Sequence, residues 1–197
     1  KCRVSRMNIK FYILLLVVVQ FIFSESIAVT SKTKGDVRFK KKNEKELKNQ
    51  LKAGVDLFNN DYIKTGSDGF AKYVYLDDGT QIKIHNNSEV YIRGVLEQRA
   101  IVKQLKVEDG TVKLDVKKQN VDEFTVITPT SVASVKGTSF WLDCQGKSGD
   151  KFYGESGTVV IGNLESGIKR SLEKNTVAQS LSDGSLDVRA MTQGKLH

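Results

Sequence analysis

The chain of 197 residues has little of the chemistry that many classes of protein require. Its two cysteines, Cys2 and Cys144, exclude a disulfide scaffold and a multi-cysteine zinc module. One of its two histidines is the terminal His197, so we expect no histidine-ligated metal site. The single proline, Pro129, excludes collagen-like and proline-rich linker proteins. A hydrophobic fraction of 39% is enough for a packed core and argues against global disorder.

The chain contains a single long hydrophobic run, Phe11–Phe23. A lysine precedes this run, and Ser26-Ile27-Ala28 follows it with small residues at positions −3 and −1 of a cleavage site. This layout is typical of a secretory signal peptide, which we predict over residues 1–28. The run is shorter than the roughly 20 residues that span a bilayer comfortably. Retention of the segment as an N-terminal anchor helix is the alternative.

The predicted export of the protein bears on its expected ligands and location. Without residues 1–28 the formal net charge falls from +8 to +5, an ordinary surplus that, with export, argues against nucleic-acid binding. We expect the protein in the periplasm, anchored in the inner membrane if the signal is retained, or at the cell surface. Membrane contact is expected only through residues 11–23. Cys144 alternates with Phe140 and Leu142, so we predict that it is a small buried side chain rather than a nucleophile.

Alternating apolar and polar residues dominate the rest of the chain. Runs rich in β-branched and aromatic residues are separated by turn pairs such as Asp68-Gly69 and Asp109-Gly110. This pattern predicts an all-β fold, β-solenoid-like or sandwich-like, with a single domain over 29–185 and a C-terminal tail over 186–197. The predicted strands are 70–76, 81–85, 89–93, 105–107, 111–116, 124–127, 139–142, 158–161 and 186–188.

One segment allows two interpretations. Residues 43–52 contain Leu47 and Leu51 four positions apart among several charged residues, which suits one or two helical turns. A polar hairpin fits the same residues, and we favour it.

Motifs that carry catalysis are missing. The sequence has no G-x-S-x-G, no P-loop and no G-x-G-x-x-G. His85 would have to serve any Ser–His or Cys–His pair, and it closes a predicted strand as a polar residue beside a turn. Asp77-Asp78 lacks the further ligands of a calcium loop and fits a β-turn. We therefore expect no enzyme, no catalytic residues, no cofactor and no metal.

Several segments, in order, resemble the FecR-type domain of bacterial envelope proteins. They begin with NDYIKTG at 60–66 and LDDGTQI at 76–82, continue with LKVEDGTV at 105–112, and end with FTVITPT at 124–130 and ASVKGTSF at 133–140. The resemblance spans roughly residues 33–162. Its signature residues suit turns, strand ends and core positions, so we interpret them as a folding signature rather than as ligands. They are Gly54, Asp61, Thr65, Gly66, Asp78, Gly79, Gly110, Thr128, Pro129, Gly137, Thr138 and Phe140.

The resemblance implies an all-β periplasmic domain that acts through protein–protein contacts. In the iron-uptake regulators of this family, such a domain relays the state of an outer-membrane receptor. This chain shows neither their cytoplasmic segment nor their C-terminal module, so we expect it not to act as a complete sigma regulator by itself. We predict a non-enzymatic binding, scaffold or signalling-related module of the cell envelope, with partner and oligomeric state open.

The alternative is a carbohydrate- or polymer-binding surface module. Its aromatic candidates are Tyr73, Tyr75, Tyr91 and Trp141, provided that they lie on a solvent-facing sheet.

Overall fold

The computed structural model describes residues 25–47, 49–97, 100–119 and 122–191. The predicted signal segment therefore lies almost entirely outside the described residues. Within them, every regular element is a β-strand apart from one 3-10 turn, η1 (Gly146–Ser148). The all-β prediction is confirmed, and no helix in the described ranges is long and apolar enough to cross a membrane.

The strands form two layers that share one long strand, β9 (Ala100–Asp115). The first layer uses the C-terminal part of β9 and pairs its strands in the spatial order β4-β1-β6-β7-β9-β12-β13-β16-β17. Besides β9, its strands are β1 (Ala28–Lys34), β4 (Asp56–Leu57), β6 (Phe70–Tyr75), β7 (Gln81–Ile84), β12 (Ser139–Cys144), β13 (Gly149–Ser156), β16 (Thr176–Leu181) and β17 (Leu186–Ala190).

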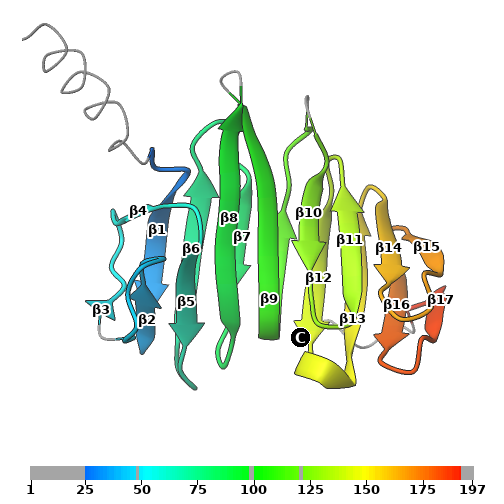
Figure 1. Ribbon diagram of the computed structural model, residues 1–197. Helices are drawn as coiled ribbons and strands as arrows, with labels where there is room; N and C mark the ends of the chain where they lie inside the picture. Colours follow the sequence, from blue (N-terminus) through cyan, green and yellow to red (C-terminus); the bar gives the residue numbers. More distant parts are fainter. Residues whose placement is uncertain (1–24, 48, 98–99, 120–121, 192–197) are drawn as a thin grey trace, which may run out of the picture.

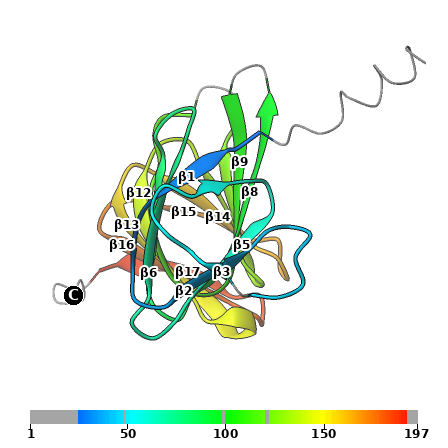
Figure 2. The same ribbon diagram turned by 90° about the vertical axis from the view of Figure 1, so that its left-hand side faces the viewer.

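The second layer uses the N-terminal part of β9 in the order β3-β2-β5-β8-β9-β10-β11-β14-β15. Figure 1 shows the strands side by side along the molecule, and Figure 2 shows β6, β12, β13 and β16 on one side with β5 and β8 on the other. The remaining strands are β2 (Val37–Lys40), β3 (Asn49–Gln50), β5 (Asp61–Thr65), β8 (Glu89–Glu97), β10 (Phe124–Ile127), β11 (Ser131–Val135), β14 (Val159–Asn163) and β15 (Lys169–Leu172).

Alternation along the strands fills the space between the layers. Side chains of one parity point inward, and the largest of them are fully buried. Burial of this apolar surface is the main driving force for the fold. The largest buried side chains are Tyr73, Tyr75, Phe124, Phe140 and Phe152.

The crossing of β9 between layers occurs at Gly110. This residue has φ +97°, and a Cβ there would lie 2.3 Å from the Ser88 Oγ. Only glycine fits such a backbone and such a close approach. The segments 105–107 and 111–116, predicted as two strands around a tight turn, are therefore two parts of one element that bends from layer to layer.

The folded unit is longer than predicted at both ends. Ala28 begins β1 and is fully buried, and the Ile27 side chain is 3% exposed. At the other end, β17 pairs with β16 as far as Ala190, so the first five residues of the predicted tail are a strand. Of the described residues in 43–52, only β3 forms a strand. It lies antiparallel to β2, with Arg38 opposite Gln50, so the first strand of the hairpin lies before the predicted segment.

Candidate functional site

The signature residues occupy turns and buried contacts. The Thr65 hydroxyl donates to the carbonyl of His85 at 2.6 Å and accepts from the Ser88 N–H at 2.9 Å, which joins two turns. Gly79 has φ +74°, and Phe140 is fully buried. These positions give the residues a role in folding, with the exceptions described below.

A buried carboxylate explains the Thr128-Pro129-Thr130 part of the signature. Asp150 is 1% exposed, and its Oδ2 accepts hydrogen bonds from the hydroxyls of Thr128 at 2.5 Å, Ser131 at 2.6 Å, and Thr130. Its Oδ1 is buried without a hydrogen-bond partner among the described residues. Since a buried charge is costly unless it is hydrogen-bonded, the three hydroxyls stabilise a carboxylate that no cation contacts in the described chain.

Asp150 also lies beside the lone buried thiol. Cys144 is 1% exposed, and burial, followed by the neighbouring Asp150 charge, raises the pKa of its thiol. The prediction of a small buried side chain is confirmed. A thiol with a raised pKa carries little thiolate and is a poor nucleophile.

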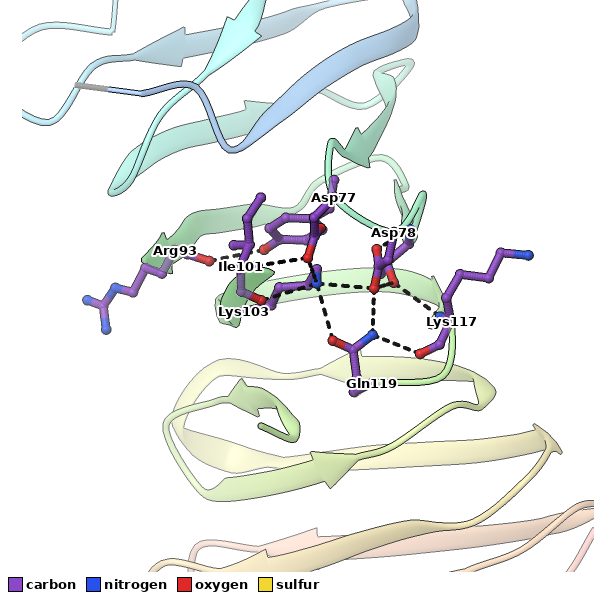
Figure 3. A network of polar contacts seen from close by, with 9 residues as sticks. Asp77, Asp78, Arg93, Ile101, Lys103, Lys117 and Gln119 are labelled. Atoms are coloured by element: carbon purple, nitrogen blue, oxygen red, sulfur yellow. Dashed lines mark hydrogen bonds and ion pairs between the residues drawn. The ribbon is translucent and has the colours of Figure 1, made fainter. Parts of the chain in front are cut away.

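The second buried charge is Lys103, whose side chain is 2% exposed (Figure 3). Its Nζ lies 2.6 Å from the Asp77 Oδ2 and 3.1 Å from the Asp78 Oδ2. It also donates to the Ile101 carbonyl at 3.1 Å and to the Gln119 Oε1 at 3.2 Å. The ammonium group therefore has both counter-charge and hydrogen-bond acceptors, which is what burial of a lysine requires.

The Lys103 network fastens the segment that follows β9. The Gln119 side-chain amide donates to the Asp78 Oδ2 at 2.7 Å and to the Lys117 carbonyl at 2.8 Å. The Gln119 backbone N–H donates to the Lys136 carbonyl at 2.8 Å. Burial alone would raise the pKa of Asp78, but hydrogen bonds from the Thr80 N–H, Gln119 and Lys103 outweigh it and lower that pKa. Asp78 is therefore a carboxylate at neutral pH and holds the segment 116–119 in place.

This segment pairs with the turn between β11 and β12 through backbone hydrogen bonds between Val116 and Thr138, and residues of both line a groove. The groove has a volume of about 680 Å³ and adjoins a smaller hollow of about 300 Å³. The two share Val116, Lys117, Gly137 and Thr138 as lining residues, so they form one trough. We call it the rim groove. The larger part is lined by Val116, Lys117, Lys118, Glu123, Ser134, Lys136, Gly137, Thr138, Thr158 and Val160.

Two signature residues, Gly137 and Thr138, line the rim groove. A Cβ at Gly137 would lie 3.2 Å from the Lys118 Cα, so a larger residue would press on the adjacent segment 116–119. Thr138 is 5% exposed, and its Oγ1 is buried without a hydrogen-bond partner among the described residues. A buried hydroxyl without a partner costs free energy, so its position needs an explanation beyond packing.

The outer face of the first layer carries a different cluster. The Ser139 hydroxyl lies 2.6 Å from the Asp115 Oδ1 and 2.9 Å from the Glu155 Oε2. Lys83 pairs with Asp115 at 2.7 Å, and Lys113 pairs with Glu155 at 2.7 Å. Both carboxylates have lowered pKa values, because hydrogen bonds and these lysines outweigh the effect of burial. They are therefore ionised and paired, and neither is a free general base.

His85 does not form a catalytic pair. Its ring lies between Phe70 at 5.5 Å and Trp141 at 4.9 Å between centroids, and its Nε2 has no hydrogen-bond partner in the described chain. Burial, then Lys83 and Lys113, lower its pKa. The described ranges also hold no group of three His, Cys, Asp or Glu side chains that could bind a metal.

The aromatic candidates for sugar binding are mostly engaged within the fold. Tyr73 and Tyr75 are fully buried and belong to the core. Lys106 lies over the Tyr91 ring at 5.6 Å, and Lys113 over the Trp141 ring at 5.2 Å. These four residues do not form an open aromatic platform.

The two buried charges and Gln119 were not predicted from the sequence. Lys103 alternates in phase with the buried Ile101, Leu105 and Val107, and that parity is the signal that it points inward. Asp150 likewise has the parity of Phe152. We found no comparable signal in the sequence for Gln119, because its role depends on contacts between segments distant along the chain.

Comparison with known proteins identifies the fold. Residues 61–153 match the family model described as FecR protein. Two crystal structures of a "putative anti-sigma factor" from Parabacteroides distasonis ATCC 8503 share the fold, with TM-scores of 0.56 and 0.54 at 17% and 18% sequence identity. The alignments cover 66% of this chain and 59% of those chains, so the match spans less than two thirds of their length. A search of the curated proteins found no match.

The matched range begins at β5 and ends within β13, which places it across both layers. It contains every signature residue except Gly54, and also Lys103, Gln119 and Asp150. It is narrower than the 33–162 suggested by the sequence resemblance. Residues 61–153 of this chain are therefore similar to the FecR family.

Proposed function

We propose that the chain is an exported, non-enzymatic module that acts in envelope signalling through protein–protein contacts. The observation that carries the proposal is the FecR match over residues 61–153. The likeness to anti-sigma-factor structures supports the same fold, although at 17% and 18% identity it does not transfer their role.

Non-enzymatic action is supported by the state of the reactive groups. Cys144 is buried, the Nε2 of His85 has no partner in the described chain, and the carboxylates around Ser139 are paired with lysines. None of these groups has the nucleophile–base geometry of covalent catalysis.

Export is supported by the apolar run 11–23, but the structure bears on where a cut would fall. Ile27 donates its N–H to the Leu57 carbonyl at 2.9 Å and accepts from the Leu76 N–H at 3.1 Å. A cut after Ala28 would remove these bonds and two buried side chains. We therefore propose that any processing spares Ile27. Intact mass of the native protein tests this point, because a chain beginning at Val29 would contradict it.

Location is tested by fusing alkaline phosphatase after Gly167, an exposed turn position. Alkaline phosphatase gains activity only where its disulfides form, outside the cytoplasm. The proposal expects an active fusion that loses activity when residues 7–24 are deleted. An inactive, stably expressed fusion would overturn the exported role. A fusion that stays active without residues 7–24 would overturn this segment as the export signal.

A further inference from the structure

We propose that the rim groove binds an extended acidic segment of a partner protein. The inference deepens the proposed function and rests on it, because it assigns the protein contact to one place.

The charge of the lining residues favours an acidic ligand. Three lysines line the larger part of the groove, Lys117, Lys118 and Lys136, against one acid, Glu123. Glu123 pairs with Lys136 at 3.2 Å across exposed positions, where an ion pair is weak and readily exchanged. Lys117 and Lys118 have no ion-pair partner in the described chain and are both exposed. The groove therefore presents a net positive surface that complements carboxylates.

The shape of the groove also favours an extended segment. Gly137 leaves the wall without a side chain, and Val116 and Val160 add apolar surface, Val160 being 42% exposed. Thr138 also lines the groove, with its hydroxyl oxygen buried within the wall. A volume of about 680 Å³, extended by about 300 Å³, suits a short length of chain that alternates acidic and apolar residues.

The wall formed by residues 116–119 is held rigidly, which favours binding. Gln119 ties the 116–119 wall to Asp78 and to the Lys136 carbonyl, and Lys103 anchors Asp78 and Gln119 from inside. A wall held in this way is ordered before the ligand arrives, which lowers the entropic cost of binding. A nucleic acid is the less favoured ligand, since the described residues that line the groove include no aromatic side chain for base stacking.

Fluorescence anisotropy with a labelled peptide of sequence Asp-Val-Glu-Val-Asp-Val-Glu tests the proposal. The native protein is compared with the triple variant Lys117→Ser, Lys118→Ser, Lys136→Ser. The matched control is Lys42→Ser, Lys147→Ser, Lys174→Ser, which removes the same charge from exposed positions elsewhere. Circular dichroism and thermal unfolding confirm that both variants are folded.

The proposal expects the native protein to bind with a Kd below about 1 mM. Binding should weaken at least about tenfold in the groove variant and by less than about twofold in the control. A labelled Lys-Val-Arg-Val-Lys-Val-Arg peptide should not bind.

Equal weakening in both variants would show attraction by net charge alone and would overturn the proposal. No binding of the acidic peptide, or preferential binding of a labelled oligothymidylate, would overturn it as well. These outcomes leave the phosphatase-fusion result untouched, so failure of the groove is distinguishable from failure of the exported role.

Discussion

Two buried charges at opposite ends of β10 are stabilised in different ways. Lys103 lies where β9 begins, and it is paired with two carboxylates that belong to the turn after β6. Asp150 lies beyond the other end of β10, and three neutral hydroxyls surround its Oδ2. The first arrangement joins separate segments of the chain, including a wall of the rim groove, whereas the second closes one turn onto one strand. The Lys103 site therefore supports the fold and also a wall of the rim groove, whereas the Asp150 site supports the fold alone.

The largest expected effect is that of Lys103→Ala. It leaves Asp77 and Asp78 close together without their shared cation, and we expect it to lower the free energy of unfolding by about 3 kcal/mol. Urea unfolding measures this change. The triple replacement Lys103→Met, Asp77→Asn, Asp78→Asn removes all the charges together and should cost less than about 1.5 kcal/mol. Equal losses of unfolding free energy for Lys103→Ala and for the triple replacement would contradict an ion-pair role of Lys103.

Asp150→Ala comes next. It leaves the hydroxyls of Thr128, Thr130 and Ser131 without their acceptor, and we expect a loss of about 2 kcal/mol in unfolding free energy. Asp150→Asn retains an acceptor and should lose about 1 kcal/mol. The affinity for the acidic peptide, measured under conditions in which both variants are folded, sharpens the comparison. This affinity should change little in Asp150→Ala and fall in Lys103→Ala. A matched fall in both would show that the two sites do not differ in function.

Acid should weaken the Lys103 site through Asp78. Because the folded-state pKa of Asp78 lies below its unfolded value, its contribution to stability is present above the unfolded pKa and is lost as pH falls through the folded pKa. We expect a decline in unfolding free energy below about pH 4, and Asp78→Asn should remove the part of it that Asp78 contributes. Urea midpoints from pH 6 to pH 3 measure it. An unchanged pH slope in Asp78→Asn would contradict the assignment.

The smallest expected effect concerns the groove itself. Thr138→Val removes a buried hydroxyl that has no partner in the described chain, and it should raise the free energy of unfolding by about 0.5 kcal/mol. Thr125→Val, in β10 at a half-buried position, is the control for the substitution type. Destabilisation by Thr138→Val in urea unfolding would contradict this expectation.

Much of the fold was predictable, because the alternation of apolar residues along a strand and the residues that favour turns are local features of the sequence. Residues 124–127 were predicted as a strand with the observed bounds, and Cys144 was predicted to be buried from its alternation with Phe140 and Leu142. Strands poor in apolar residues escaped prediction. β15, with the sequence KRSL, is an example, since its pairing with β14 rather than its own pattern places it in the sheet.

The rim groove was not predictable, because it depends on long-range contacts. Lysine is rarely buried, so Lys103 was overlooked despite its inward parity. The hydrogen bond from Gln119 to Asp78 joins residues 41 positions apart, and no local pattern indicates it. Gly137 and Thr138 were noticed as part of a folding signature, and only the structure shows that they also line a groove.

The central claim is that the wall fastened by the Lys103 network forms the contact surface of this domain. Titration of the ¹⁵N-labelled protein with the Asp-Val-Glu-Val-Asp-Val-Glu peptide, followed by amide chemical shifts, tests it most directly. We expect the shifts to concentrate at residues 116–119 and 136–138, with little change around Asp150. Shifts confined to other parts of the surface, or no shifts at millimolar peptide, would contradict the account.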